Sequence, residues 1–260
     1  MTYVLDAARL RSERRIGPVR VPLLAIGLLA VVAFAVDTYE AALHPYLPFD
    51  LTVTRALQAV GWGPLAPVFG VADWLDGARQ GAVAVAALAL VLLLNRRAMP
   101  LLVVAALGSA ACAAIEHLVA RPRPTAGLVH VVRHAGGFSY PSGHVVFLTW
   151  FLPLLVLALL RPHLPAAIHR RSAAMSWGAR TPWIPARAGA IAACVATPVV
   201  ITVVAAGRVV TGQHWPSDVL GGLALGVAWT ALVLSVRRLS DPVAQKGPGA
   251  RTRAPARLWG

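Results

Sequence analysis

Long apolar segments alternate with short polar ones along most of the chain. A helix of about 20 apolar residues is needed to cross a bilayer core about 30 Å thick. Six segments approach that length, namely residues 21–36, 81–94, 100–118, 142–160, 188–206 and 217–236. The pattern therefore predicts an all-α integral membrane bundle in which residues 21–236 form six transmembrane helices. The second segment is the shortest and has the least sharply defined ends.

Composition supports a membrane protein, and the distribution of charge predicts its orientation. The chain is 58% hydrophobic and 13% charged, whereas soluble domains carry about 25% charged residues. If the amino terminus is cytoplasmic, residues 1–20, 95–99, 161–187 and 237–260 lie on the same side and hold 18 of the 24 Lys and Arg residues. Such an excess is typical of cytoplasmic loops. We therefore expect a multi-pass cell-membrane protein with both termini in the cytoplasm.

The net charge of +14 follows from these cytoplasmic segments and does not indicate nucleic-acid binding. The basic arm 1–20 and the basic tail 237–260 are expected to contact anionic lipids at the cytoplasmic face. The tail lacks periodicity and is predicted to be disordered. The apolar run 21–36, which follows the basic arm, also resembles a secretory signal peptide. We interpret it instead as an uncleaved membrane anchor.

Two shorter elements are expected in the longest outer segment. Residues 50–60 are predicted to form a short helix whose apolar side carries Leu51, Leu57 and Val60. Residues 62–74 are apolar but too short to cross a membrane, and prolines and glycines interrupt them. Tryptophans at their ends suit a position at headgroup level. We interpret this stretch as an interfacial or re-entrant cover over the outer face.

Three polar clusters fall at the outer ends of predicted spans, in residues 116–124, 139–144 and 207–218. Each has a structural interpretation by itself: snorkelling arginines, a capped helix with an interfacial histidine, and a polar interfacial loop. Polar groups at membrane depth are costly, however, and are commonly functional. Their arrival on one side of the membrane favours a single outward-facing site.

The first cluster contains Arg121 and Arg123 separated by Pro122, with Pro124 following. Prolines block helix formation and hold the chain extended, so alternate side chains should point in opposite directions. We therefore predict that one of these arginines points into the site and the other toward solvent or lipid headgroups.

In the second cluster, Pro141 and Ser142 are typical of a helix start, and Gly143 permits close approach of a ligand to the backbone. Unpaired N–H groups at a helix start attract anions. His144 would then project from the first turn, where it could donate a proton to a leaving oxygen.

The third cluster combines Arg208 with His214 and Asp218, which are four residues apart. If a helix begins at Pro216, this spacing stacks the carboxylate against the imidazole. The carboxylate would accept the Nδ1 proton and leave Nε2 as a nucleophile. The planar guanidinium of Arg208 is suited to binding phosphate oxygens.

The two cysteines, Cys112 and Cys194, lie in predicted spans at depths that differ by about 9 Å. That difference argues against a disulfide, and neither cysteine has a ligand-like neighbour. Both are predicted to be packing residues, and no metal site is expected.

These clusters resemble the signature of the type-2 phosphatidic acid phosphatase family, within the superfamily that includes vanadium haloperoxidases. The family pattern is Lys, six residues and Arg-Pro, then Pro-Ser-Gly-His, then Ser-Arg, five residues, His, three residues and Asp. The matching positions are Arg123-Pro124, Pro141–His144, Arg208, His214 and Asp218. The resemblance covers residues 116–218 and extends to a layout of six helices.

The resemblance implies roles for the matching residues. His214 would attack phosphorus and form a phosphohistidine, Asp218 would orient it, and His144 would protonate the departing group. Phosphoryl oxygens would be bound by Arg123, Arg208 and the backbone amides of Ser142 and Gly143. This chemistry requires neither a metal nor another cofactor.

The chain departs from the family pattern at two positions. Glu116 stands where the family usually has lysine, and a carboxylate repels phosphate. Either Glu116 pairs with Arg121, Arg123 or Arg208 while a replacement cation comes from Arg133, His130 or His134, or the site is weakened or has changed substrate. Gly207 replaces the family's serine and removes one hydroxyl donor.

We therefore expect metal-independent hydrolysis of a lipid phosphate or pyrophosphate at the outer membrane face. Undecaprenyl or another polyprenyl pyrophosphate, phosphatidylglycerol phosphate and phosphatidic acid are candidate substrates, and analogy favours the carrier pyrophosphate. The alternatives are a lipid phosphotransferase and a non-catalytic lipid-phosphate binding or transport protein. A soluble haloperoxidase does not fit the hydrophobicity. Nothing in the sequence indicates an oligomeric state.

Overall fold

The computed structural model of the chain describes residues 19–63, 66–74, 77–160 and 183–241. The predicted tail beyond residue 241, nearly all of the basic arm and most of the 161–187 loop lie outside these ranges. The elements are α2 (Val21–Leu43), α3 (Pro48–Ala59), α4 (Ala66–Trp74), α5 (Ala78–Asn95), η2 (Arg96–Ala98), α6 (Met99–Val119), α7 (Gly143–Leu160), α9 (Trp183–Val210), α10 (Pro216–Ser235) and α11 (Arg237–Ser240). Within the described ranges the regular structure is helical, apart from an isolated β-bridge between Val19 and Val236.

Prolines mark the first turn of α2, α3, α6 and α10. The N–H groups of a first turn have no partner inside the helix, and the fixed φ of proline is already helical. In α3 and α10 an acid follows in the same turn. Asp50 accepts a hydrogen bond from the backbone N–H of Leu47, and Asp218 accepts one from that of Trp215. These acids therefore define where their helices begin.

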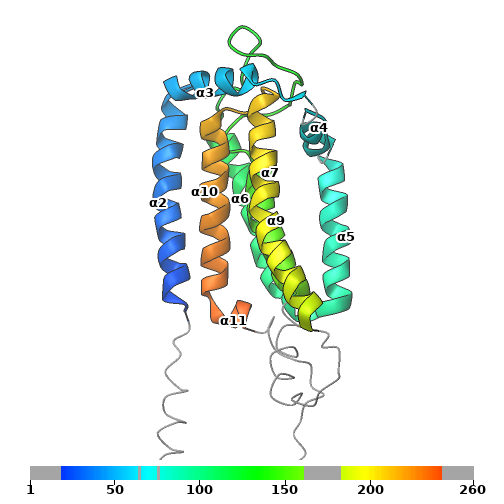
Figure 1. Cartoon of the computed structure of the whole chain (residues 1–260). Coiled ribbons are helices and arrows are strands. Elements are labelled where there is room, and N and C mark those ends of the chain that lie inside the picture. Colours follow the sequence, from blue (N-terminus) through cyan, green and yellow to red (C-terminus); the bar gives the residue numbers. More distant parts are fainter. Residues whose placement is uncertain (1–18, 64–65, 75–76, 161–182, 242–260) are drawn as a thin grey trace, which may run out of the picture.

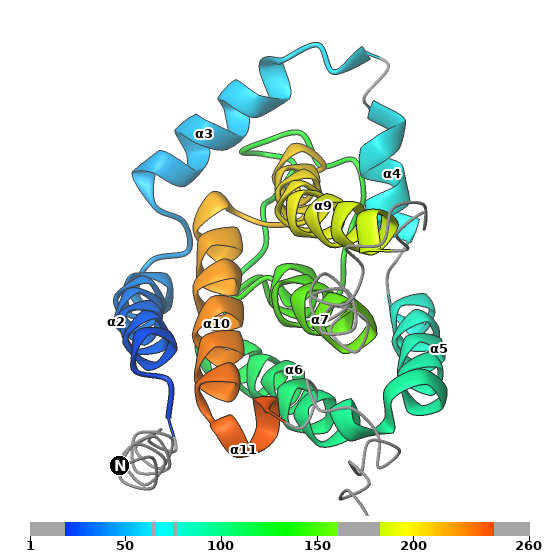
Figure 2. The same cartoon turned by 60° about the horizontal axis from the view of Figure 1, so that its bottom comes forward.

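The long helices form a bundle around α7. In Figure 2, α7 lies near the middle of the view, with α5, α6, α9 and α10 around it and α2 against the outer side of α10. Figure 1 shows α3 crossing the upper ends of the bundle and α4 beside the upper part of α9. The loop between α6 and α7 lies at the same upper end.

Four stretches in the described part of the chain are long and apolar enough to cross a membrane: Val21–Leu43, Ala78–Val119, Ile191–Val210 and Pro216–Ser235. The second contains α5 and α6, which run in opposite directions on either side of η2 (Figure 1). A shorter apolar helix covers Gly143–Leu159. The predicted all-α membrane bundle is confirmed, and the count of six spans stays a prediction.

Small residues of α10 bring it close to α7. A Cβ added to Gly222 would lie 2.8 Å from the backbone oxygen of Ser142, and one added to Gly226 would lie 2.5 Å from Cβ of Thr149. Glycines four residues apart allow close approach of helices in membranes, where apolar burial drives association weakly. This contact holds the start of α7 against the start of α10, so the second and third polar clusters lie side by side.

The buried side of α3 differs from the prediction. The helix forms where expected, but Val60 is 50% exposed, and Leu51 and Leu57 are only half-buried. The fully buried residues are Asp50 and Thr54. The physical reason is the position of α3 across the upper end of the bundle, where it covers polar loops instead of an apolar core (Figure 1).

The prediction that the two cysteines form no disulfide is confirmed, and the prediction that both are packing residues holds for Cys112 but is wrong for Cys194. Cys112 is buried in the core between α6 and α7, Cys194 is exposed on α9, and both are free.

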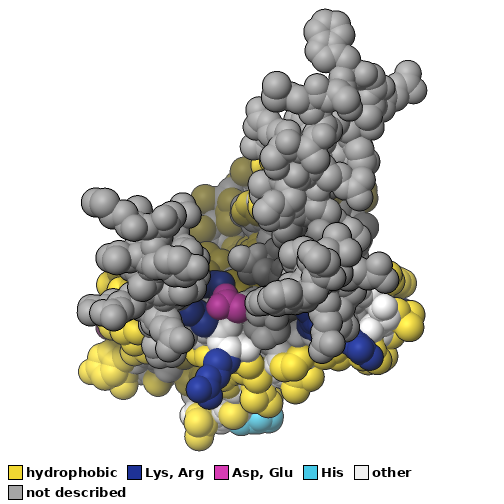
Figure 3. All heavy atoms as spheres, turned by 90° about the horizontal axis from the view of Figure 1, so that it is seen from below, with side chains coloured by type: hydrophobic (Ala, Val, Ile, Leu, Met, Phe, Trp, Pro, Cys, Tyr) yellow, Lys and Arg dark blue, Asp and Glu magenta, His cyan; other side chains and the backbone are white. Residues whose placement is uncertain are grey.

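The lower face of the bundle is basic where it is described. Arg20 precedes α2, Arg96 and Arg97 form most of η2, and Arg237 and Arg238 open α11. Seen from below, basic side chains lie among hydrophobic ones, with an acidic group beside them (Figure 3). Arg20 forms a salt bridge with Asp241.

Candidate active site

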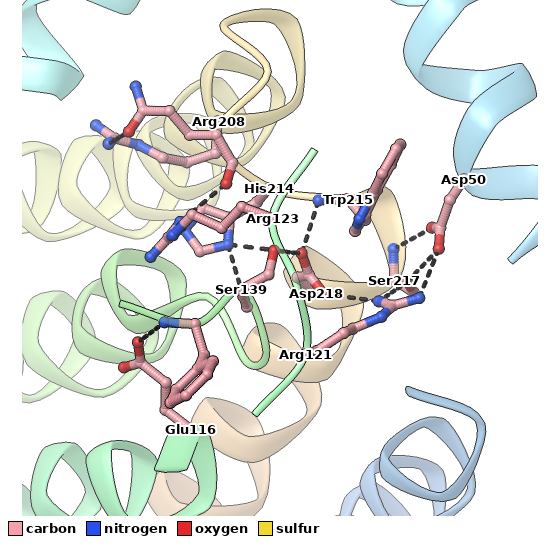
Figure 4. A network of polar contacts seen from close by, with 12 residues as sticks. Asp50, Glu116, Arg121, Arg123, Ser139, Arg208, His214, Trp215, Ser217 and Asp218 are labelled. Atoms are coloured by element: carbon pink, nitrogen blue, oxygen red, sulfur yellow. Dashed lines mark hydrogen bonds and ion pairs between the residues drawn. The ribbon is translucent and has the colours of Figure 1, made fainter. Parts of the chain in front are cut away.

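The three polar clusters meet at the upper end of the bundle, in a network drawn in Figure 4. The loop between α6 and α7 supplies Arg121, Arg123 and Ser139, and the turn between α9 and α10 supplies His214. Residues 96 positions apart in the chain, Arg121 and Ser217, are in direct contact. The predicted convergence of these clusters at one end of the bundle is therefore present in the fold.

His214 lies on a tight turn whose backbone is tied to the end of α9. The N–H groups of Gln213 and His214 both donate to the carbonyl of Arg208, at 3.0 and 3.2 Å. Gly212 makes this turn possible, because its φ is +71° and an added Cβ would lie 2.4 Å from the carbonyl oxygen of His130. The imidazole is consequently held in a buried position, with 4% of the residue exposed.

Two hydrogen bonds determine the protonation of the neutral His214 ring. Nδ1 lies 2.8 Å from the carbonyl oxygen of Ser139. Because a carbonyl can only accept, Nδ1 carries the proton and Nε2 has the lone pair. A guanidinium nitrogen of Arg123 lies 3.2 Å from Nε2 and donates to it. The nucleophilic nitrogen therefore points toward a cation suited to binding phosphate.

The predicted direct bond between Asp218 and His214 is replaced by another arrangement. The carboxylate lies 3.7 Å from Nδ1, beyond hydrogen-bond distance, and the carbonyl of Ser139 accepts the hydrogen bond from Nδ1–H. Asp218 accepts from the Ser139 hydroxyl and the Trp215 N–H instead. The reason is its position in the first turn of α10, where the carboxylate turns back to cap the helix. Asp218 still places a negative charge beside the imidazole.

Arg121 corrects the prediction that one arginine of the pair faces solvent or headgroups. Its side chain is fully buried, and it donates to Asp218 at 2.7 Å and to Asp50 at 3.0 Å. It also donates to the Ser217 hydroxyl at 2.6 Å and the His44 carbonyl at 3.1 Å. The extended chain does send the two arginines in different directions, but both directions lead into the protein because α3 covers the loop.

Asp50 is a site residue that sequence reasoning missed. Both of its oxygens are used: one accepts from the Ser217 N–H at 2.8 Å, and the other from the Ser217 hydroxyl at 2.7 Å and from Arg121. Asp50, Arg121 and Asp218 thus form a buried chain of alternating charge that reaches the imidazole (Figure 4). No local sequence pattern indicates this network of charges, because Asp50 and Arg121 are 71 residues apart.

Ser142 offers a different donor from the one predicted. Its backbone N–H, expected to bind a phosphoryl oxygen, donates to the carbonyl of Asp218 at 2.9 Å. Its hydroxyl is buried and has no hydrogen-bond partner among the described residues. Buried hydroxyl groups normally have a hydrogen-bond partner. The Ser142 hydroxyl is therefore the group of this residue that a bound ligand could use.

Arg208 is almost fully buried at the end of α9 and donates to the side-chain oxygen of Gln213 at 2.8 Å. The neighbouring Gly207 has a steric explanation. A Cβ at this position would lie 3.0 Å from the ring of Phe69, which α4 packs against it. A serine side chain at this position would therefore compete with Phe69 for space. Glycine at residue 207 allows α4 to pack on α9.

Glu116 accepts a hydrogen bond from the backbone N–H of Phe138 at 2.9 Å. Its carboxylate therefore holds the loop one residue before Ser139, as Figure 4 shows. Of its three predicted partners, Arg121 pairs with Asp50 and Asp218 instead, and pairing with Arg123 or Arg208 stays a prediction. Gly143 and His144, at the start of α7, line a cavity of about 260 Å³ together with Glu116.

The candidate replacement cations Arg133, His130 and His134 are all exposed on the loop between α6 and α7. The backbone of His130 is fixed from α3, because its N–H and carbonyl both bond to the Gln58 side chain. The replacement of the family's lysine by one of these three residues stays a prediction.

Comparison with known proteins supplies a family and a fold. A family model described as the PAP2 superfamily matches residues 97–241, more than half of the chain. No curated protein matches the chain. A crystal structure described as the first transmembrane PAP2 type phosphatidylglycerolphosphate phosphatase from Bacillus subtilis is similar with a TM-score of 0.60 and 20% sequence identity. The alignment covers 80% of this chain and 94% of that chain. At this identity the likeness shows a shared fold.

Proposed function

Because the chain belongs to the PAP2 superfamily, we propose that it hydrolyses a lipid phosphate through a phosphohistidine formed on His214. The observation that carries this proposal is the state of the imidazole. Nδ1 is tied to the carbonyl of Ser139, and the lone pair of Nε2 faces the guanidinium of Arg123 at 3.2 Å. A phosphoryl group bound by Arg123 would lie against the nucleophile.

In the first step, the Nε2 lone pair forms a bond to phosphorus while the bond from phosphorus to the leaving oxygen breaks. Arg123 transfers its hydrogen bond from Nε2 to a phosphoryl oxygen, which releases the nucleophile. Arg208 and the hydroxyl of Ser142 supply further donors to these oxygens. His144 gives a proton to the leaving oxygen, so an ester leaves as a neutral alcohol.

In the second step, the phosphohistidine is hydrolysed. His144, now neutral, accepts a proton from water as the water oxygen bonds to phosphorus and the bond to Nε2 breaks. Inorganic phosphate leaves, and both histidines return to their starting states. The positive charge on the phosphorylated ring is stabilised by Asp218, 3.7 Å from Nδ1, and by the Ser139 carbonyl.

The proposed setting is a six-span membrane domain with this site on the extracytoplasmic side and both termini in the cytoplasm. The arginines at the lower ends of the described helices support this orientation. Acids near the opposite end, including Glu40, Asp50 and Glu116, are consistent with it. The substrate is a lipid phosphate whose headgroup reaches the outer leaflet.

Labelling with a membrane-impermeant maleimide in intact cells tests this topology. In a Cys194→Ala background, Gly127→Cys on the upper loop should be labelled and Arg238→Cys should not, because only the former faces outward. Both positions are exposed, and an added Cβ at residue 127 meets nothing within 4 Å. Both variants should be labelled after permeabilisation. If only Arg238→Cys were labelled in intact cells, the orientation of the protein in the membrane would be the opposite of the one proposed.

Phosphate release from a panel of lipid phosphates and diphosphates tests the function itself. Purified protein in detergent should release inorganic phosphate from at least one lipid in the panel without added metal. Binding of these lipids with no release from any of them would favour the binding or transport alternative. Transfer of phosphate to an added alcohol in preference to water would favour a phosphotransferase.

His144→Ala distinguishes the proton donor from a structural histidine. In single-turnover kinetics the variant should lose about 10²–10⁴-fold in the rate of the first step for an alkyl phosphate, whose alcohol is a poor leaving group. The first step should slow far less for a nitrophenyl phosphate, because nitrophenolate leaves without a proton, while hydrolysis of the phosphohistidine, which also uses His144, should slow equally for both. His44→Ala, which removes an exposed histidine side chain at the same end of the bundle, is the matched control and should behave like wild type. Equal losses in the first step for both leaving groups would contradict proton donation by His144.

A further inference from the structure

Two cavities meet at His144. The first, of about 260 Å³, lies between the upper ends of α5, α6 and α7, and its polar lining includes Glu116, Gln80 and Ser109. The second, of about 150 Å³, lies between α5, α7 and α9 and is lined by apolar side chains such as Val83, Phe147 and Val204. His144 and Gln80 line both cavities.

The arrangement suits a lipid leaving group. On the basis of the proposed function, the leaving oxygen lies against His144, because this residue protonates it. The polar part of the leaving group would then occupy the cavity beside Glu116, which we call the Glu116 cavity. The adjoining apolar cavity would take the beginning of the hydrocarbon chain.

The carboxylate of Glu116 restricts what the Glu116 cavity accepts. A carboxylate only accepts hydrogen bonds and has about four lone-pair sites, of which the Phe138 N–H uses one. Hydroxyl or ammonium groups next to the leaving oxygen would satisfy the remaining sites. A second phosphate would place two anions in one half-buried cavity, where charge repulsion is less screened than in water.

We propose that the Glu116 cavity is the leaving-group subsite, and that Glu116 makes the enzyme selective for lipid monophosphates bearing hydrogen-bond donors near the phosphate and against lipid diphosphates. The leaving group of a monophosphate is an alcohol, which tolerates a neighbouring carboxylate. The leaving group of a diphosphate is itself a phosphate. The selectivity therefore comes from the charge on the leaving side and not from the transferred phosphoryl group, which is common to both substrates.

Chain-matched substrates that carry a free hydroxyl beside the phosphate test the proposal: 1-palmitoylglycerol 3-phosphate and 1-palmitoylglycerol 3-diphosphate. Wild type should favour the monophosphate in kcat/KM by about tenfold or more. In Glu116→Gln the amide oxygen still accepts from the Phe138 N–H, so only the charge is lost. This variant should reduce the preference about tenfold, mainly by improving the diphosphate reaction, and Glu116→Lys should reduce it further. Glu40→Gln, which removes an exposed acid from the same end of the bundle, should leave it unchanged.

Two outcomes would overturn the subsite assignment. One is a wild-type preference for the diphosphate, and the other is an unchanged preference in Glu116→Gln while both lipids are hydrolysed. If wild type hydrolyses neither of these two lipids, the subsite is judged by binding instead, and the proposed function fails only if no lipid of the panel releases phosphate. A lipid phosphonate should then bind more tightly than the matching methylene-diphosphonate, with the difference reduced in Glu116→Gln. Equal binding differences in both proteins would reject the subsite.

Discussion

Arg121→Met will lower the stability of the protein by about 3–5 kcal/mol and will abolish hydrolysis. The guanidinium is the cation between two fully buried carboxylates, at 3.0 Å from Asp50 and 2.7 Å from Asp218. Removing it leaves both acids buried without their counter-charge, which costs more than the loss of the ion pairs alone. Thermal or denaturant unfolding in detergent measures the loss.

A control variant separates the loss of stability caused by unpaired buried charges from any general effect of removing an arginine. Arg55→Met removes an exposed arginine of α3 that donates to the carbonyl of Leu128, and it should change stability by less than about 1 kcal/mol. Asp50→Asn combined with Arg121→Met should cost less than the sum of the single losses, because the double variant buries one fewer unpaired charge. Equal effects of Arg121→Met and Arg55→Met would contradict the buried network.

His214→Ala will reduce kcat by about 10³-fold or more while leaving the fold and ligand binding largely intact. The loss follows from removal of the nitrogen that bonds to phosphorus. Arg123 and Arg208 remain in place, so a phosphonate analogue should bind His214→Ala within a few-fold of its affinity for wild type. The measurements are single-turnover kinetics and equilibrium binding on the same preparations.

His44→Ala is the matched control, because it removes an exposed histidine side chain from the same end of the bundle and keeps the backbone carbonyl that accepts from Arg121. Its kcat should equal that of wild type. Hydrolysis by His214→Ala at more than about a tenth of the wild-type rate would show that another group attacks phosphorus.

Much of the architecture follows from periodicity and charge, because a membrane helix must be long, apolar and internally hydrogen-bonded. The apolar segment 142–160 became α7 (Gly143–Leu160), almost residue for residue. The tight turn at Gly212 and the helix start at Pro216 also follow from local preferences. The convergence of His214 with Arg123 was predictable from the alternation of membrane sides.

The partners of the charged groups were not predictable, because they come from elements distant in the chain. From the local sequence, Asp50 is simply an acid in the first turn of a short helix. It contacts Arg121 only because α3 lies over the loop that carries Arg121. Asp218 was predicted to stack on His214 and accept the hydrogen bond from its Nδ1. It caps the start of α10 instead, and the backbone carbonyl of Ser139 accepts the hydrogen bond from Nδ1–H. The sequence shows which residues are polar but not which of them α3 buries.

Trapping the phosphorylated enzyme tests the central claim most directly. Wild-type protein mixed with a hydrolysable lipid phosphate, quenched in alkali within one turnover and digested, should yield a peptide phosphorylated on His214. Phosphorus NMR should place the phosphate on Nε2, since Nδ1 is occupied by its bond to the Ser139 carbonyl. Phosphate on Nδ1, phosphate on another residue, or turnover with no phosphorylated enzyme would contradict the account.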